Sequence, residues 1–506
     1  LFYLLFLLNG HDSPGPVDRY LFPSLKRDFD SGALSRDEAR MIVDCLWLKF
    51  EEQEAFGATV GGRARSGADA SNELTLLCID SIRRLRLLSP RTALRWHPGL
   101  SARVFEKAID CVADGCTYPA FVNDEAIIAA MVDRGVARED AREYTFVGCG
   151  QTYPHGRGHG NYEDVIINSA KPLEWALHDG VDPTTGKQEG PATGDPRDFG
   201  CYEAFEAAYR RQMDRHISQA IEAVNDRRRR AVGQAHDFLR SLLTRSCVER
   251  GLDWHAGGAD YSEGMVDMVG LTTVIDSLLA IKLCVFEGKQ VSLEKLVQTL
   301  DRDWEGQEAL RLFLLNKVPK FGNNLPEADA PAVAELGRVN GFIRSHRTVF
   351  DGPWGMDIVG WSGAVEMGKV TGATPDGRRR GEPLADCAGP AQGRNVSGLT
   401  ASLLSMTGLP NRKVHGPLAL SLRFPKSAVE DAEGRAKLGA AVRAYFEMGG
   451  QQVQISIAGT EDMKAAQRNP EAYRSLMVRV GGFSAYFTRL GKAFQDDMIA
   501  RSECEL

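Results

Sequence analysis

One stretch near the end of the chain decides how this sequence is interpreted: Leu476-Met477-Val478-Arg479-Val480-Gly481-Gly482-Phe483-Ser484-Ala485-Tyr486-Phe487. A short run with β-branched residues leads into a glycine pair, which predicts a strand that ends in a tight loop. Glycine has no Cβ, so its Cα can flatten without a steric clash. A radical on such a Cα is delocalised onto the neighbouring amide groups. We therefore treat Gly482 as a candidate for a stored backbone radical.

A second β-rich run, Tyr144-Thr145-Phe146-Val147, leads into Gly148-Cys149-Gly150 much earlier in the chain. The S–H bond of a cysteine is close in strength to the C–H bonds of activated substrates, so a thiyl radical can abstract a hydrogen almost reversibly. Alone, each loop is ambiguous, because a lone cysteine after a strand is usually a small core residue. Together they predict two loop tips that meet, in which Gly482 stores a radical and Cys149 uses it.

Composition places the chain among ordinary globular proteins. Its 506 residues are 43% hydrophobic and 25% charged, with a net charge of −7, which gives no general attraction to nucleic acid or to anionic membranes. The dense basic run from Arg227 to Arg230 follows a helical pattern and is interpreted as a solvated helix face. The ten cysteines form no CxxC pair, so we expect reduced thiols in a cytoplasmic protein without a zinc site.

The chain begins with the apolar run Leu1-Phe2-Tyr3-Leu4-Leu5-Phe6-Leu7-Leu8. This run lacks an initiator methionine and a basic flank, and it is too short to span a bilayer. We interpret it as a buried segment of a longer protein, and the chain as truncated at its N-terminus.

Helical patterns alternate with short strands along the chain, which predicts the α/β class. Ser35 followed by Glu38 forms a capping box for a helix over residues 36–52. A long helix is expected over residues 202–243 and a strand over 452–457. The glycine-rich residues 150–162 are expected to form an irregular loop.

Further motifs extend the pattern around the two loops. The segment Arg479 to Ala485 resembles the radical-loop signature of glycyl radical enzymes, the pyruvate formate-lyase superfamily, and its second glycine corresponds to Gly482. The other segments that share this resemblance are Gln495-Asp496-Asp497-Met498-Ile499, Thr374-Pro375-Asp376-Gly377-Arg378, Asn123-Asp124, Gly148-Cys149 and Gly257-Gly258-Ala259.

The resemblance implies part of a ten-stranded α/β barrel made of two five-stranded halves. Residues 1–372 would form a barrel region that is incomplete at its N-terminus, and residues 373–506 a glycyl radical domain inserted into the barrel. It also implies that no cofactor or metal binds this chain. A partner that resembles a radical S-adenosylmethionine iron–sulfur activating enzyme would install the radical on Gly482, and the protein would form a homodimer.

The residues around Cys149 bear on the type of reaction. Pyruvate formate-lyase has two adjacent cysteines, whereas Cys149 lies between Gly148 and Gly150. The dehydratase branch usually has Gly-Cys-x-Glu, in which the glutamate exchanges protons with the substrate. Here that position is Gln151, which cannot exchange a proton at neutral pH.

The residues that follow Gln151 could supply the missing chemistry. His155 is predicted to act with Gln151 as a catalytic residue, because a histidine can serve as general acid or base. Arg157 could hold a carboxylate, sulfonate or phosphate, and Tyr153 and His159 are further candidates for binding substrate. Alternatively, the two histidines face solvent or bond the loop backbone. Weaker candidates for the pocket are Asp260, Tyr261 and Glu263.

We expect a radical lyase that cleaves a C–C, C–O, C–N or C–S bond of a small polar substrate. An arylacetate-type decarboxylase or a fumarate-adding synthase is the alternative, which an apolar pocket would favour. A formate acetyltransferase-like activity and a catalytically inert homologue remain open, although the intact Gly482 and Cys149 argue against the latter.

Overall fold

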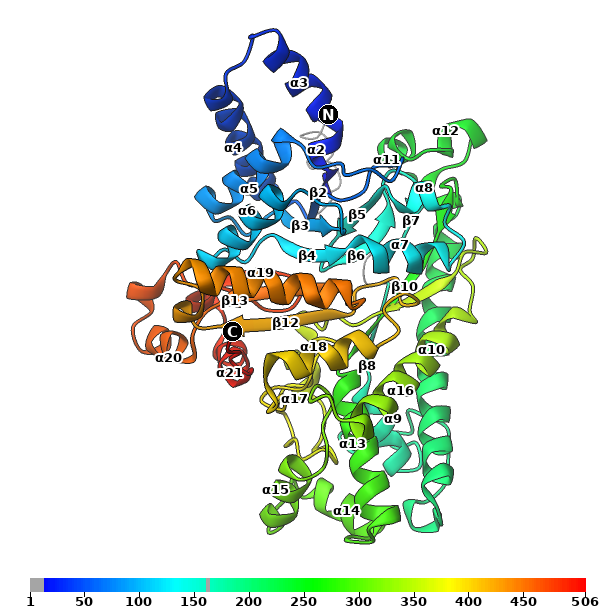
Figure 1. Cartoon of the computed structure of the whole chain (residues 1–506). Helices are drawn as coiled ribbons and strands as arrows, with labels where there is room; N and C mark the ends of the chain where they lie inside the picture. Colours follow the sequence, from blue (N-terminus) through cyan, green and yellow to red (C-terminus); the bar gives the residue numbers. More distant parts are fainter. Residues whose placement is uncertain (1–12, 161–163) are drawn as a thin grey trace. The chain divides into compact units, whose positions relative to one another are not determined.

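The computed structural model describes residues 13–160 and 164–506 (Figure 1). The apolar residues 1–8, for which the sequence predicts burial, lie outside the described residues. Two compact units are present, and each is described by itself. The first contains residues 13–160, 231–263 and 411–506, and the second contains residues 164–230 and 264–410. In the described ranges, no helix has both the length and the apolar character needed to cross a membrane.

The first unit is built on a six-stranded sheet with the order β1-β2-β3-β4-β13-β12. Its strands are β1 (Gly15–Pro16), β2 (Gly57–Gly61), β3 (Arg91–Trp96), β4 (Ala120–Asn123), β12 (Ala419–Phe424) and β13 (Gln452–Ile457). Neighbouring strands are parallel, except that β4 and β13 are antiparallel. The sheet therefore joins two sets of parallel strands along one antiparallel seam.

Helices connect the parallel strands. They are α5 (Glu73–Leu85) between β2 and β3, α6 (Ala102–Ala113) between β3 and β4, and α19 (Ala432–Glu447) between β12 and β13. Figure 1 shows α19 running alongside β13 and β12. The side chain of Asn72 caps α5 by accepting from the backbone N–H groups of Leu74 and Thr75. Apolar side chains at helical spacing, including Leu74, Cys78 and Ile82, are buried on one face of this helix.

Smaller elements complete the first unit. The helices are α2 (Val17–Tyr20), α3 (Phe22–Asp30), α4 (Arg36–Glu52), α7 (Asp124–Val132), α8 (Arg138–Ala141), α11 (Phe238–Leu243), α12 (Cys247–Arg250), α20 (Thr460–Arg468) and α21 (Lys492–Ala500). The strand pairs are β5 (Tyr144–Val147) with β6 (Gln151–Pro154), β7 (Gly158–His159) with β9 (Tyr261–Ser262), and β14 (Met477–Arg479) with β15 (Ser484–Tyr486). Short 3₁₀ turns are found at Trp254–Ala256, Lys426–Ala428, Pro470–Tyr473 and Phe487–Arg489.

The second unit contains a parallel sheet of three strands with the order β11-β10-β8. These strands are β8 (Val165–Asn168), β10 (Gly264–Val269) and β11 (Trp354–Asp357). Its helices are α9 (Ala170–Leu177), α10 (Tyr202–Ala231), α13 (Leu271–Ile281), α14 (Leu293–Asp301), α15 (Glu308–Asn316), α16 (Pro326–Arg344), α17 (Gly363–Lys369) and α18 (Gly398–Gly408). A 3₁₀ turn at Pro196–Asp198 and a π turn at Lys282–Glu287 complete the unit.

The structure confirms the helix predicted over residues 36–52, including its capping box between Ser35 and Glu38. It also confirms the strand over residues 452–457. The irregular loop predicted over residues 150–162 is wrong for residues 151–154, because Gly148 and Gly150 adopt positive φ angles of 56° and 143° and reverse the chain into a paired strand, β6. Residues 161 and 162 of this prediction lie outside the described residues.

The single helix predicted over residues 202–243 is also wrong. It ends at Ala231, shortly before Gly233 with φ at 73°, and a new helix begins after its cap at Asp237. The reason is that a left-handed glycine ends a helix whatever the pattern of the residues that follow.

Candidate active site

The first functional element is the hairpin of β5 and β6. Val147 and Gln151 pair across it, so the three-residue turn Gly148-Cys149-Gly150 forms its tip. Cys149 is only 4% exposed. The Cys149 thiol therefore lies at the end of a β-hairpin whose two strands are paired up to the turn.

A buried ion pair anchors this hairpin to the main sheet. Arg95 of β3 donates to Asp124 at 2.9 Å and 3.0 Å, and the Tyr144 hydroxyl of β5 donates to the same carboxylate at 2.8 Å. Burial alone would raise the pKa of Asp124, but the Arg95 guanidinium and these hydrogen bonds hold it below its usual range. Since all three side chains are fully buried, the network fixes the base of the hairpin relative to β3.

The second functional element is the hairpin of β14 and β15. Met477 pairs with Tyr486 and Arg479 with Ser484, which leaves Gly482 in the connecting turn. Gly482 has φ at 74°, a left-handed conformation that favours glycine. Apolar side chains from the hairpin and the helices that flank it pack together beneath the turn: Ala458, Met463, Ala466, Val478, Val480, Phe487 and Met498.

Gln454 of β13 holds the glycine turn in place. Its Oε1 accepts from the Gly482 backbone N–H at 2.9 Å and from Nε of Arg479 at 2.7 Å. Its Nε2 donates to Ser421 of the neighbouring strand β12 at 3.0 Å. Arg479, which is 1% exposed, also lies with Cζ 4.5 Å from the centre of the Tyr118 ring. The glycine turn is therefore fixed by polar contacts to the main sheet.

Arg91, the first residue of β3, links the two hairpins. Its Nη1 donates to Sγ of Cys149 at 3.4 Å. Its Cζ lies 4.5 Å from the centre of the Phe56 ring and 5.8 Å from the ring of Phe483, the residue that follows Gly482. One side chain thus contacts both the cysteine and the neighbour of the glycine.

The predicted site residues Gln151 and Tyr153 lie on β6. Gln151 is fully buried and follows the cysteine tip directly. Tyr153 lies two residues further along the strand, and its ring makes an edge contact with the ring of His415 at a centroid distance of 6.1 Å. Alternate residues of a strand share one face, so Gln151 and Tyr153 project from the same side of β6.

The other three predicted residues lie beyond the far end of β6, about 13 Å of strand away from the cysteine tip. The backbone N–H of His155 donates to Glu143, and its ring stacks on Tyr20 at 6.4 Å. Arg157 forms ion pairs with Asp140 and Asp260, each at 3.1 Å. His159 packs against Trp254 at a centroid distance of 4.1 Å. The structure thus places Gln151 beside Cys149 and these three away from it, and the roles assigned to all of them stay predictions.

The weaker candidates take part in polar pairs. Tyr261 donates its hydroxyl to Asp140 at 2.8 Å, and Glu263 bonds Nε2 of His415 at 3.1 Å. Burial would raise the pKa of Glu263, but Arg134 and His415 hold it below its usual range. Arg134 and His415 therefore stabilise the buried carboxylate of Glu263, and no ligand is needed to explain its charge.

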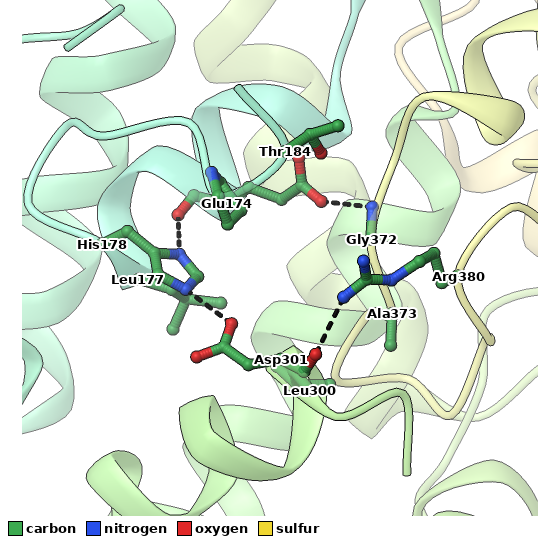
Figure 2. Close-up of a pocket in the computed structure, with 10 residues that line it drawn as sticks. Glu174, Leu177, His178, Thr184, Leu300, Asp301, Gly372, Ala373 and Arg380 are labelled. Atoms are coloured by element: carbon green, nitrogen blue, oxygen red, sulfur yellow. Dashed lines mark hydrogen bonds and ion pairs between the residues drawn. The ribbon is translucent and has the colours of Figure 1, made fainter. Parts of the chain in front are cut away.

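A hollow in the second unit is too small for a substrate. Figure 2 shows Glu174, His178, Asp301, Gly372 and Arg380 around it. Its volume of about 20 Å³ suits a single water molecule. Burial would lower the pKa of His178, but its bonds to Asp301 and the Glu174 carbonyl raise it. The lining groups bond one another, so we interpret this hollow as structural.

Sequence reasoning missed Arg91, Gln452 and Gln454. A usable signal was present in the strand predicted over residues 452–457, where Gln452, Gln454 and Ser456 alternate with apolar residues. Alternation on a buried strand puts the polar residues on one face, and such a face indicates a polar interior rather than a packed core. Arg91 gave no comparable signal, because its contacts come from segments distant in the sequence.

Comparison with known proteins identifies the family of this chain. Residues 2–368 match the pyruvate formate lyase-like family, and residues 384–488 match the glycine radical family. The trans-4-hydroxy-L-proline dehydratase of Clostridioides difficile is 32% identical over 512 residues, which are 97% of this chain and 64% of that protein. The isethionate sulfite-lyase of Desulfovibrio desulfuricans is 32% identical over 517 residues, 97% of this chain and 62% of that protein.

A solved structure extends the comparison to the fold. The glycerol-bound, B12-independent glycerol dehydratase of Clostridium butyricum superposes with a TM-score of 0.93 at 29% identity, over 98% of this chain and 64% of that one. The mixed α/β class is thereby confirmed, and the sheets are consistent with this type of barrel, although the described strands do not close into a ring.

Arg91 thus connects a buried cysteine tip with a buried glycine turn. The chain belongs to the pyruvate formate lyase-like family of glycyl radical enzymes. It spans about 62% to 64% of the length of the relatives named above.

Proposed function

We propose that this protein is a glycyl radical lyase that acts on a small polar substrate. The observation behind the proposal is the bridge made by Arg91, which bonds Cys149 and lies over the ring next to Gly482. The relatives are named for dehydration and for sulfite elimination, which are bond cleavages of this kind.

The residues suggest a cycle in which each hydrogen atom passed between Gly482, Cys149 and the substrate carbon is accounted for. The Gly482 radical takes the hydrogen atom from the Cys149 thiol, which leaves a C–H bond on the glycine and a thiyl radical on the cysteine. The thiyl takes a hydrogen atom from a substrate carbon, and the substrate radical then loses its leaving group. The product radical recovers the hydrogen atom from Cys149, and the thiyl in turn takes the glycine hydrogen to restore the Gly482 radical.

Gln151 limits how the leaving group departs. An amide can donate a hydrogen bond but exchanges no proton at neutral pH, so Gln151 would orient the substrate beside Cys149. A leaving group such as sulfite needs no protonation by a neighbouring side chain. His155 would act as acid or base only if the end of β6 moved toward the substrate.

The polar character of the site favours a lyase over the decarboxylase or synthase alternative. Arg91 contacts the cysteine through its charged guanidinium, and an apolar substrate would leave that charge without compensation. In the same proposal, Tyr153, Arg157 and His159 bind substrate only if their segment approaches Cys149.

The activation of this protein would need a partner. A radical S-adenosylmethionine iron–sulfur enzyme would install the radical on Gly482, and no cofactor would remain bound to the chain. We also propose a cytoplasmic homodimer, and a boundary near residue 372 between the barrel region and the radical domain, since the two family matches end and begin at residues 368 and 384.

The test uses the intact protein, activated without oxygen by its cognate activating enzyme. We expect turnover of at least one of trans-4-hydroxy-L-proline, isethionate and glycerol, the compounds named for the relatives and the solved structure. Cys149→Ser should keep the radical signal and lose turnover, because a serine O–H bond is too strong to donate the hydrogen. The control Cys45→Ser changes an exposed cysteine and should behave as the parent. Turnover by Cys149→Ser would refute the proposal.

A further inference from the structure

Arg91 is a cation beside the reactive sulfur. It donates one hydrogen bond to Cys149 and lies over two aromatic rings, those of Phe56 and Phe483. Among the described residues, no carboxylate forms an ion pair with it. Arg95 of the same strand differs, since it is paired with Asp124. An arginine remains charged at any pH the protein meets, so Arg91 contributes a positive charge that no carboxylate of the described ranges neutralises by an ion pair.

The aromatic neighbours orient this charge. A guanidinium over the face of a ring gains cation–π attraction but keeps its in-plane N–H groups for other acceptors. One of these N–H groups points at Cys149. The remaining ones suit a carboxylate, sulfonate or phosphate, which an arginine binds through two parallel hydrogen bonds.

Gln452 is a second polar group at the same place. Its side chain is 0% exposed, and in the described part of the chain neither its Oε1 nor its Nε2 has a hydrogen-bond partner. A Cβ placed on Gly150 would lie 2.9 Å from this Oε1 and 3.0 Å from this Nε2, so the amide lies directly against the cysteine tip. A buried amide without partners costs stability unless a ligand completes its bonds.

We propose that Arg91 and Gln452 form an anion anchor that selects a substrate with a carboxylate, sulfonate or phosphate group. Arg91 binds the anionic group, and the Gln452 amide bonds an adjacent polar group such as a hydroxyl. The anchor holds the substrate carbon next to Sγ of Cys149. This inference rests on the proposed function, because it assigns a substrate class to the same site.

A pair of reagents tests the anchor without a known substrate. Iodoacetate and iodoacetamide both alkylate a cysteine with loss of iodide, but only iodoacetate is an anion. Their rates at Cys149 are measured by mass spectrometry of the intact, unactivated protein at one pH. The ratio of the two rates cancels any change in the thiolate fraction, which affects both reagents equally.

We expect the iodoacetate-to-iodoacetamide ratio in the parent to exceed that of Arg91→Met by about tenfold, the effect of one nearby charge at low effective dielectric. Arg91→Lys should recover part of the ratio, because it restores the charge but not the paired N–H groups. Gln452→Leu should lower the ratio by a smaller factor. The control Arg103→Met removes an exposed charge on α6 and should leave the ratio unchanged.

Two results would overturn the anchor. One is an equal ratio in the parent, Arg91→Met and Arg91→Lys, all with the same thermal midpoint. The other is a Cys149 that neither reagent labels, because a substrate of similar size must reach the same sulfur. Failure of the proposed function would look different: the protein would show no radical signal after treatment with the activating enzyme.

Discussion

The contact between Gln454 and the glycine turn leads to a quantitative prediction. Replacing Gln454 with leucine removes the oxygen that accepts from the Gly482 N–H at 2.9 Å and from Arg479 Nε at 2.7 Å. A neutral hydrogen bond contributes about 1 kcal/mol and one to a charged group about 2 kcal/mol. Because Gly482 and Arg479 are both buried, we expect the turn to lose about 3 kcal/mol of local stability.

Amide hydrogen exchange measures this loss directly. In the regime where exchange reports the opening equilibrium, 3 kcal/mol corresponds to about a 100-fold faster exchange of the peptide that spans residues 476–487. Gln454→Glu keeps an acceptor for both donors and should retain most of the protection. The control Gln467→Leu on α20 removes a solvent-exposed hydrogen bond to Asp496 of α21 and should change exchange of this peptide little.

The result that would refute the reasoning is equal protection in the parent and in Gln454→Leu. An equally large loss in Gln467→Leu would also refute it, because the effect would then come from general loosening of this part of the unit. If the prediction holds, one amide on β13 sets how often the glycine turn leaves the sheet, which is the motion that an activating partner would need.

Two further predictions concern buried charges. Burial raises the pKa of Asp276 to about 7 even though Lys320 lowers it, so the folded protein favours the protonated acid, and stability should fall as pH rises from about 4 to 7 and level off above. We will compare urea unfolding of Asp276→Asn and the parent between pH 5 and 8. The stability of Asp276→Asn relative to the parent should increase by about 2.5 kcal/mol over this range, and a constant difference would contradict this. Arg95→Met should lower the free energy of unfolding by about 3–5 kcal/mol, because Asp124 would remain charged and buried. In the same assay, the double variant Arg95→Met, Asp124→Leu should recover most of this loss. Equal losses in the single and the double variant would contradict the role of the pair.

Local signals in the sequence were enough to predict the elements that bear the site. The β-branched runs before Cys149 and Gly482 form β5 and β14, and the capping box at Ser35 begins α4 as expected. These signals depend on only a few neighbouring residues, so they can be interpreted without knowledge of the fold. The strand β6 was missed because Gln151-Thr152-Tyr153-Pro154 is short and is defined by its partner across a glycine turn.

The contacts that define the site could not be predicted in the same way. Arg91, Cys149 and Phe483 meet only because β3 and the two hairpins fold onto one sheet. Hydrogen-bond partners such as Gln454 and Gly482 are likewise set by strand order, which local patterns do not give. The residues of segment 155–159 were close to Cys149 in sequence, but an extended strand of four residues separates them in space.

The central claim is that Gly482 stores the radical. The most direct measurement is an anaerobic electron paramagnetic resonance spectrum of the intact protein after activation, prepared with ordinary glycine and with glycine deuterated at Cα. The account predicts a doublet from one α-hydrogen, its collapse to a single line in the deuterated protein, and its loss in Gly482→Ala. A doublet that persists in Gly482→Ala, or no signal with an activating enzyme proven on this protein's own peptide around Gly482, would contradict the account.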